Sequence, residues 1–207
     1  MSRVDHLRAA ARCYARAGRE DDALRCSVDA GDLGSAARLH ERAGRFTAAA
    51  EAHAAAGQPR EAARCWEAAD APRPAALAWA AAGEPLRAAW LHAHHLAEPA
   101  AAAALLADHA GTDLLALHAA EVVRLRLRPA APGAMLRLAE TWRAVSELPT
   151  TGDRTRVLAW CVSVARAGGR PDLVLRMYAS QSDAAAWERQ TAELLGQPLR
   201  PLDPETR

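Results

Sequence analysis

Small and large apolar positions recur every thirteen residues along the first half of the chain. When a Gly or Asp is counted as position 1, position 6 is Ala in all seven units, and position 7 is Ala in six of them. Position 10 is mostly a larger side chain, Tyr, His or Trp. Residues three and four apart share a helix face, so positions 3, 6, 7 and 10 form one packing stripe. The pattern predicts a short helix over positions 3 to 12 of each unit. The seven units begin at Asp5, Gly18, Gly31, Gly44, Gly57, Asp70 and Gly83.

Proline and glycine mark where each predicted helix begins and ends. Pro59, Pro72 and Pro85 stand at position 3, and proline is tolerated in the first turn of a helix but not in its interior. Glycine at position 1 suits the left-handed residue that follows a helix. A ten-residue helix is too short to be stable alone, so each one must pack on its neighbours. The sequence predicts an all-α fold, an α-solenoid of short antiparallel helical hairpins with 13 residues per helix and 26 per hairpin.

Two quoted segments carry a resemblance to a known group of repeats. The segments "AARLHERAGR" (Ala36 to Arg45) and "AARCWEAAD" (Ala62 to Asp70) resemble the tetratricopeptide-like superfamily and the short-hairpin solenoids of vesicle-coat and vesicle-attachment proteins. The tetratricopeptide unit is about 34 residues long, whereas a hairpin here takes 26. The resemblance covers residues 5–110. It implies a helical-repeat fold and a role in interactions, and it brings no specific ligand pocket.

The repeat becomes irregular after Gly83, and this predicts three regions. Residues 1–110 form the regular array, 111–196 a degenerate helical continuation, and 197–207 a flexible, Pro-rich tail. The segment "PAAPG" (Pro129 to Gly133) interrupts the continuation. Apolar periodicity predicts further helices over 113–128, 134–147, 154–167, 171–181 and 183–195.

Composition narrows the class of protein. The formal net charge is +1, which does not favour a nucleic-acid partner, and all 26 basic residues are Arg. The absence of Lys, Ile and Asn indicates a GC-rich, bacterial coding sequence. No apolar run is long enough to span a membrane, and no leading segment reads as a secretory signal. The four cysteines form no CxxC pair, so we expect a cytoplasmic protein that does not bind a membrane.

Candidate metal ligands and nucleophiles have simpler explanations in this pattern. His92, His94 and His95 cluster, but spacing specifies no third ligand for a tetrahedral site. His40 and His53 take position 10, where other units carry Trp or Tyr, which indicates packing residues. Three cysteines share position 9 with Leu and Ala, as small core residues do. We therefore expect no catalytic residue, no metal and no cofactor.

A second stripe, at positions 4, 8 and 12, faces away from the packing stripe. In the odd-numbered units it is basic over the first three helices and apolar in the fourth. Arginine forks suit carboxylates, so the stripe is a candidate docking surface for an acidic partner segment, with a solvated face as the alternative. The change to apolar residues predicts that either the C-terminal helices or a partner cover that end. The candidate partner-binding residues are Arg8, Arg12, Arg16, Arg38, Arg42, Arg60, Arg64, Leu86, Trp90 and His94.

These patterns favour a non-catalytic protein–protein interaction module, an adaptor or scaffold subunit of a bacterial multiprotein system. A solenoid offers an extended surface rather than a closed pocket. The alternative is an enzyme, or a domain that binds a small ligand or cofactor, using the irregular region 111–196. A third reading is a sensor repeat whose catalytic subunit is a separate chain.

Overall fold

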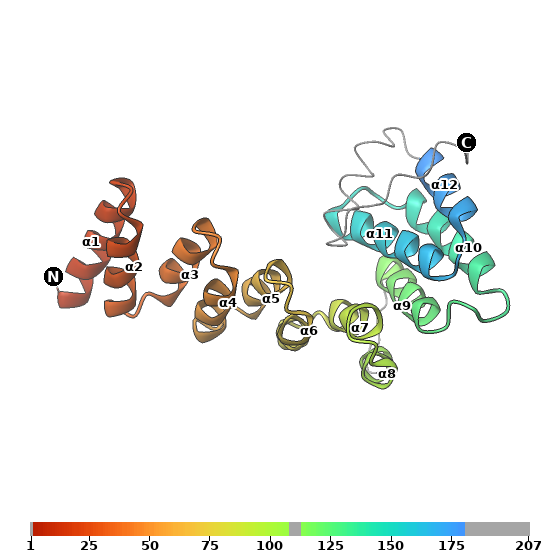
Figure 1. The fold of residues 1–207 in the computed structure, drawn as a ribbon, viewed down its shortest axis with the longest axis horizontal. Coiled ribbons are helices and arrows are strands. Elements are labelled where there is room, and N and C mark those ends of the chain that lie inside the picture. The colour runs from red at the N-terminus through yellow and green to blue at the C-terminus, as the bar shows by residue number, and fades with distance from the viewer. Residues whose placement is uncertain (1, 108–112, 181–207) are drawn as a thin grey trace. The chain divides into compact units, whose positions relative to one another are not determined.

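The computed structural model describes residues 2–107 and 113–180, and every regular element within these ranges is a helix. The chain divides into two compact units, Met1–Leu106 and Ala107–Arg207. Figure 1 shows the helices in chain order. They are α1 (Arg3–Arg16), α2 (Glu20–Asp29), α3 (Leu33–Arg42), α4 (Phe46–Ala55), α5 (Pro59–Ala68), α6 (Pro72–Ala81), α7 (Pro85–His94), α8 (Pro99–Ala107), α9 (Leu114–Leu127), α10 (Ala134–Glu147), α11 (Gly152–Ala167) and α12 (Pro171–Ala179).

The thirteen-residue period is confirmed. Each of the helices α2 to α7 begins at position 3 of its unit and ends at position 12. Each helix from α1 to α6 packs on the next one, so the first unit is an all-α solenoid. The first predicted turn is wrong, because Asp5 lies inside α1. Ser2 caps that helix: its hydroxyl accepts from the Asp5 N–H at 3.1 Å, and the Asp5 carboxylate accepts from the Ser2 N–H at 2.7 Å.

The turns between these helices use the left-handed conformation that the glycines suggested. Gly44 has φ 68°, and the N–H of the following Arg45 donates to the carbonyl of His40 at 2.9 Å. This six-to-one hydrogen bond is the Schellman motif, which satisfies a carbonyl at the helix end. Asp70 adopts the same conformation at φ 52° without being glycine. A glycine or Asp70 in the left-handed conformation therefore follows every helix from α1 to α6.

Alanines hold the solenoid together at close range. The predicted burial of Ala36, Ala49 and Ala62 at position 6 is confirmed, since none is more than 1% exposed. Side chains this small let neighbouring helix backbones approach closely. Larger residues fill the space beside them, with Trp79 at the centre of a core that Leu105 of α8 also contacts.

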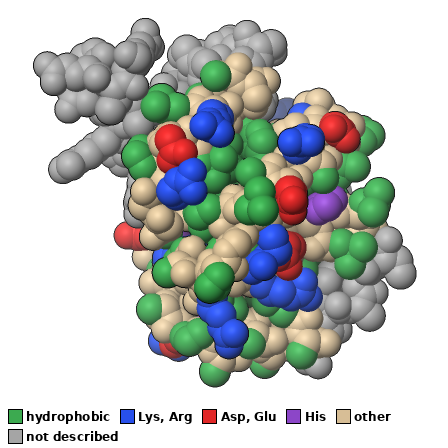
Figure 2. Space-filling model, turned by 90° about the vertical axis from the view of Figure 1, so that its right-hand side faces the viewer, with side chains coloured by type: hydrophobic (Ala, Val, Ile, Leu, Met, Phe, Trp, Pro, Cys, Tyr) green, Lys and Arg blue, Asp and Glu red, His purple; other side chains and the backbone are tan. Residues whose placement is uncertain are grey.

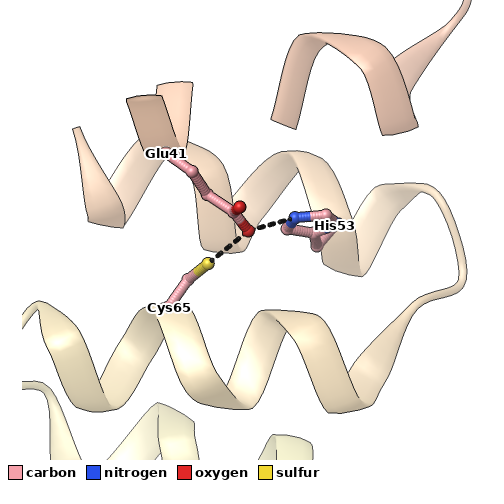
Figure 3. A group of neighbouring side chains, drawn as sticks. All are labelled: Glu41, His53 and Cys65. Carbon is pink, nitrogen blue, oxygen red and sulfur yellow. Dashed lines mark hydrogen bonds and ion pairs between the residues drawn. The ribbon is translucent and has the colours of Figure 1, made fainter. Parts of the chain in front are cut away.

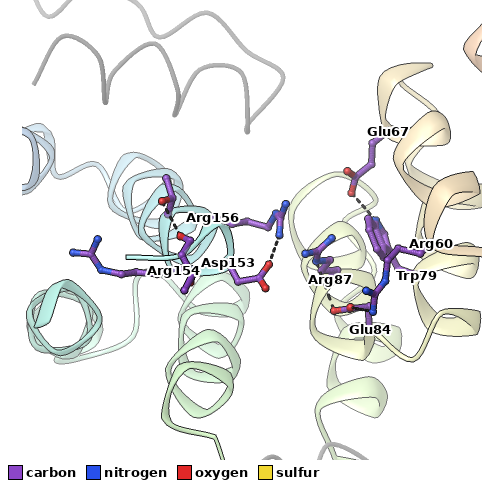
Figure 4. Close-up of polar contacts among 10 residues, drawn as sticks. Arg60, Glu67, Trp79, Glu84, Arg87, Asp153, Arg154 and Arg156 are labelled. Atoms are coloured by element: carbon purple, nitrogen blue, oxygen red, sulfur yellow. Dashed lines mark hydrogen bonds and ion pairs between the residues drawn. The ribbon is translucent and has the colours of Figure 1, made fainter. Parts of the chain in front are cut away.

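The second unit is built from longer helices. Helix α11 packs on both α9 and α10, and α12 packs on α11. All nine residues from Val157 to Ala165 of α11 are buried, so this helix forms the centre of the unit. Arg154, labelled in Figure 4, donates to the carbonyls of Val145 at 3.0 Å and Ser146 at 2.7 Å, which closes the end of α10.

The predicted helices of this region are found with small shifts at their ends. The helix over 134–147 has the predicted bounds, and those predicted over 113–128, 154–167 and 171–181 begin or end one or two residues away. The predicted boundary at 110/111, the helix over 183–195 and the tail over 197–207 lie outside the described residues. That residues 111–196 continue the repeat array stays a prediction.

Candidate functional site

A groove lined by arginines lies between the first and third helices of the array. Arg8 and Arg12 of α1 and Arg38 and Arg42 of α3 line it, and its volume is about 380 Å³. Helices α1 and α3 carry these residues at positions 4, 8 and 12, the stripe that faces away from the alanines. Four of the ten candidate partner-binding residues therefore converge on one cavity, which we call the basic groove.

Most of the positive charge in the basic groove is unpaired. Neither Arg8 nor Arg12 forms a hydrogen bond or an ion pair with any residue that the structure describes. Arg38 donates to the hydroxyl of Ser35 at 3.0 Å. Arg42 is 4.0 Å from a carboxylate oxygen of Glu20, which is the outer limit of an ion pair. These guanidinium groups can still bind carboxylates.

The two acidic residues that line the groove are already occupied. Asp32 caps α3 and accepts from the Ser35 N–H at 3.0 Å and from its hydroxyl at 2.8 Å. Burial raises the pKa of Asp32, but these hydrogen bonds and the charge of Arg8 lower it more, so its pKa lies below the usual range. Glu41 accepts hydrogen bonds from His53 and Cys65, on the side of α4 and α5.

The floor of the groove contains a polar atom without a partner. Ser27 of α2 lines the cavity and is 1% exposed. Its hydroxyl has no hydrogen-bond partner among the described residues. A buried hydroxyl without a partner costs about 1–3 kcal/mol. A ligand that reaches the floor would recover that free energy by accepting from Ser27 or donating to it.

The other candidate partner-binding residues lie away from this groove. Arg16, Arg60 and Arg64 are exposed but do not line it, and Arg60 donates to Glu84 at 2.6 Å, as Figure 4 shows. Leu86 and His94 of α7 are half-buried. Trp90 is only 4% exposed and stacks on His94, with the ring centres 4.8 Å apart. Trp90 is therefore buried rather than exposed, and its role in partner binding stays a prediction.

Charge is distributed differently on the face drawn in Figure 2. Acidic and basic side chains alternate there among apolar ones, and the coloured residues form no patch of one sign. Mixed charge of this kind is ordinary for a solvated protein surface. The basic groove, with four arginines and two occupied carboxylates, is distinct from such a surface.

A second group of polar side chains, from three helices, converges at one place, and Figure 3 shows it. Glu41 of α3, His53 of α4 and Cys65 of α5 place one potential ligand atom each within 4.8 Å of one another. His53 Nε2 is 2.7 Å from Glu41 Oε1, and the Cys65 thiol donates to the same oxygen at 3.2 Å. His53 and Cys65 are buried and Glu41 is half-buried. We call these three residues the Glu–His–Cys cluster.

The cluster arises because the side chains that touch on neighbouring helices are twelve residues apart in the sequence, one fewer than the repeat length of thirteen. Glu41, His53 and Cys65 occupy positions 11, 10 and 9 of successive units. Two units later the same register brings Glu67 to Trp79, whose indole N–H donates to Glu67 Oε1 at 2.7 Å (Figure 4). A glutamate at position 11 thus accepts from the buried residue at position 10 of the next helix.

Two of the units that lack this glutamate leave the position-10 residue of the next helix without a hydrogen-bond partner. Ala15 and Val28 stand at position 11 ahead of Ser27 and His40. The hydroxyl of Ser27 and the Nδ1 atom of His40 are buried and have no hydrogen-bond partner among the described residues. Burial lowers the pKa of His40, and so does the charge of Arg45, while Glu51 acts weakly in the opposite direction.

The Glu–His–Cys cluster shifts the pKa values of its own members. Burial raises the pKa of the Cys65 thiol to about 12, and the hydrogen bond to Glu41 adds to this effect. Burial also raises the pKa of Glu41, but the hydrogen bonds from Cys65 and His53 lower it more, so its pKa lies below the usual value. Without a further positive charge Cys65 is therefore a thiol, and its proton is shared with an ionised carboxylate.

The histidines singled out from the sequence have other surroundings. His92 lies 2.8 Å from Glu98, which also pairs with Arg73. His94 and His95 contact each other edge to face, with the ring centres 4.7 Å apart. Within the described residues, the one group of three His, Cys, Asp or Glu side chains whose ligand atoms converge is the Glu–His–Cys cluster. Sequence reasoning missed it because it searched for ligands at one repeat position instead of along the twelve-residue step.

None of the helices that the structure describes has both the length and the apolar character required to cross a membrane.

Comparison with known proteins identifies no relative: no family model matches the chain, and no curated protein and no solved structure is significantly similar to it.

Proposed function

We propose that this protein is a non-catalytic interaction module, and that its basic groove binds an acidic, extended segment of another protein. The observation that carries the proposal is the convergence of Arg8, Arg12, Arg38 and Arg42 on one cavity whose acidic residues are already occupied. Guanidinium groups bind carboxylates through paired, charge-assisted hydrogen bonds. A ligand with several carboxylates would therefore gain more here than on a surface of mixed charge.

The spacing of the arginines favours an extended segment with acidic residues at alternate positions. Arg8 and Arg12 are four residues apart on α1, and Arg38 and Arg42 are four apart on α3. Four residues of helix rise about 6 Å. Alternate residues of an extended chain lie about 6.6 Å apart and point to the same side. Carboxylates in a Glu-x-Glu pattern would thus match successive arginines along each wall.

A protein partner fits the charge of the chain better than a nucleic acid. The chain carries a formal net charge of +1, so positive charge is local to the groove rather than spread over the protein. Nucleic-acid binding domains usually carry a large basic surface that follows the phosphate backbone. The groove has room for a short segment, since its volume of about 380 Å³ lies at the lower end of the range for ligand pockets.

A wider role follows from the same architecture. We propose an adaptor or scaffold subunit of a bacterial multiprotein system, related in design to the tetratricopeptide-like solenoids. Support comes from the solenoid itself, which presents its helices in a row and leaves the odd-numbered stripe accessible at α1 and α3. The enzyme alternative required a convergent set of ionisable groups within 111–196, and no group of three His, Cys, Asp or Glu ligands lies in the described part of that range.

A peptide-binding assay tests the groove. The probe is a fluorescently labelled peptide of alternating Glu and Ser, and its binding to the full chain is followed by anisotropy at low salt. The double variant Arg8→Gln/Arg38→Gln should bind about tenfold more weakly or worse, because losing two charge-assisted contacts costs at least about 1.4 kcal/mol. Arg16→Gln/Arg64→Gln removes the same charge outside the groove and is the matched control. It should bind within about twofold of the wild type.

Three results would contradict the proposal. One is equal weakening in the two double variants, which would indicate non-specific attraction. Another is equal binding of a Gln-Ser peptide that carries no carboxylates. The third is tighter binding of a single-stranded oligonucleotide than of the acidic peptide.

A further inference from the structure

The Glu–His–Cys cluster brings together three side chains that differ in hardness as ligands but share one preferred metal. Thiolate sulfur, imidazole nitrogen and carboxylate oxygen are the three ligand types that bind zinc in proteins. Glu41, His53 and Cys65 come from three successive helices, each fixed by the alanine contacts of the array. Their ligand atoms lie within 4.8 Å of one another, so a single ion could reach all three.

The surroundings of His53 match those of a metal-bound histidine. Its Nδ1 atom lies 2.7 Å from Gln58 Oε1, the side-chain carbonyl at the start of α5. A histidine that binds a metal through one nitrogen nearly always donates the other N–H to such an oxygen. When Nδ1 donates to Gln58, Nε2 can bind a metal by giving up the proton that it donates to Glu41. Gln58 therefore holds the ring in the orientation that a metal would need.

We propose that Glu41, His53 and Cys65 form a zinc site with three protein ligands. Zn²⁺ would replace the proton that the Cys65 thiol donates to Glu41, so a Zn–S bond forms, the S–H bond breaks and one H⁺ is released to solvent. A Zn–N bond would likewise replace the N–H bond of His53 Nε2, whose proton goes to solvent when both ring nitrogens carry a proton and otherwise moves to Nδ1. Nε2 of His53 and a carboxylate oxygen of Glu41 would complete the protein ligands. This proposal departs from the expectation, drawn from the sequence, that the chain binds no metal, and it does not depend on the function of the basic groove.

Glu41 must move slightly to admit the ion. Zinc bonds of about 2.0 Å to N and O and 2.3 Å to S place tetrahedral ligand atoms about 3.3–3.6 Å apart. The N–O separation here is 2.7 Å and the S–O separation is 3.2 Å, and both involve Glu41. Glu41 is the most exposed member, at 39% of its side chain, so it can retreat by about half an ångström.

The fourth coordination position would open toward the basic groove. Glu41 belongs to both features, since it lines the groove and accepts from His53 and Cys65. A tetrahedral ion with three protein ligands keeps one position for water or another ligand, as catalytic and ligand-binding zinc sites do. A carboxylate in the groove or a water molecule would fill it.

The same register elsewhere in the array shows what a purely structural version looks like. At Glu67, Trp79 and Leu91 the glutamate accepts one hydrogen bond from an indole, and the third position is an apolar side chain. Packing alone therefore needs neither a histidine nor a cysteine here. Position 9 is Ala or Leu in four of the seven units, so cysteine is not required for the fold.

A metal titration of the full, reduced chain tests the site. Co²⁺ is the first probe, because a cobalt–thiolate bond produces a charge-transfer absorption band in the near ultraviolet. We expect one Co²⁺ per chain, loss of the band when Zn²⁺ is added, and release of at least one proton per ion. Cys65→Ala should abolish the band while keeping the fold, because alanine occupies the same position in α4 and α6.

The matched controls take the same repeat positions in other units. Cys26→Ala changes position 9 of α2, and His40→Gln changes position 10 of α3, where no glutamate precedes either residue in the register. Both should bind Co²⁺ as the wild type does. Helical content from circular dichroism identifies any variant that fails to fold, and His53→Gln then serves as the second test of the ligand set.

The proposal is overturned if the folded wild-type chain gives no thiolate band with Co²⁺. A band that persists in folded Cys65→Ala, or that disappears in Cys26→Ala, would also overturn it. Binding without proton release would show that the thiol is not a ligand and would likewise refute it. None of these results bears on the peptide assay, so the two proposals can fail separately.

Discussion

The hydrogen bond between Glu67 and Trp79 offers a direct measure of what the twelve-residue register contributes to stability. Trp79 is 1% exposed, and its indole N–H donates to Glu67 Oε1 at 2.7 Å. Glu67→Ala removes the acceptor and leaves a buried donor without a partner. The variant should lose about 1–3 kcal/mol of unfolding free energy, which is the cost of an unsatisfied buried polar group. Glu67→Gln keeps an uncharged acceptor and should lose less than about 1 kcal/mol.

Urea denaturation of the full chain, followed by circular dichroism, measures these changes. With a slope of about 2 kcal/mol/M, a loss of 2 kcal/mol moves the midpoint by about 1 M. Trp79→Phe removes the donor, and its own cost includes the ring stacked under Arg87, whose guanidinium carbon lies 4.3 Å from the ring centre. The double variant with Glu67→Ala completes a thermodynamic cycle in which that cost cancels.

The coupling free energy from this cycle should be about 1–2 kcal/mol, because an unsatisfied N–H exists only in the single variant that retains Trp79. A coupling below about 0.3 kcal/mol would refute the reasoning, since it would mean that water satisfies the indole when the carboxylate is gone. Equal destabilisation by Gln and Ala at residue 67 would also count against it. The hydrogen bonds to Glu41 and Glu67 would then have similar geometry without contributing similarly to stability.

Three further changes test other parts of the fold by the same denaturation assay. Ala49→Leu should lower the unfolding free energy by about 1–3 kcal/mol, because it overpacks a fully buried helix contact. Ala54→Leu, on the exposed side of α4, should change it by less than about 0.5 kcal/mol. Equal effects would contradict close packing at the position-6 alanines. Asp70→Gly should stabilise by about 0.5–1 kcal/mol because φ is 52° there, and a loss would show that the aspartate is needed at that turn. Arg154→Ala should lose about 1–2 kcal/mol with the two carbonyls it caps, while exposed Arg143→Ala should be neutral; similar losses would refute the capping role.

Much of the fold could be predicted from the sequence because its signals are local. Gly44 and Gly57 require a left-handed turn, and Pro59 permits a helix to begin but not to continue through it. These constraints act within a few residues, so the bounds of α2 to α7 follow from them. The repeat period predicts a turn at Asp5, so it predicts that α1 begins later than it does. A different local signal decides the start: Ser2 and Asp5 form a capping box, and α1 begins at Arg3.

The sites were harder to predict, because they depend on how helices meet. Arg8 and Arg38 could be placed on one stripe, but the cavity between α1 and α3 required the helix spacing. The convergence of Glu41, His53 and Cys65 depends on a relative shift of one residue between neighbouring units. A periodic sequence conceals such a shift, since every residue is compared only with its equivalents thirteen positions away.

The short reach of the contacts in the array has a consequence for how such a protein can evolve. The longest hydrogen bonds and ion pairs described between side chains of the first unit, such as Arg73 to Glu98, join residues 25 positions apart, about two repeat units. Tandem duplication or deletion of a 13-residue segment therefore disturbs only the helices beside the breakpoint. Gene segments of 39 nucleotides, inserted between α6 and α7 for example, would lengthen the array while the basic groove and the Glu–His–Cys cluster, both contained within α1 to α5, are inherited intact. Length and binding chemistry can thus be selected independently.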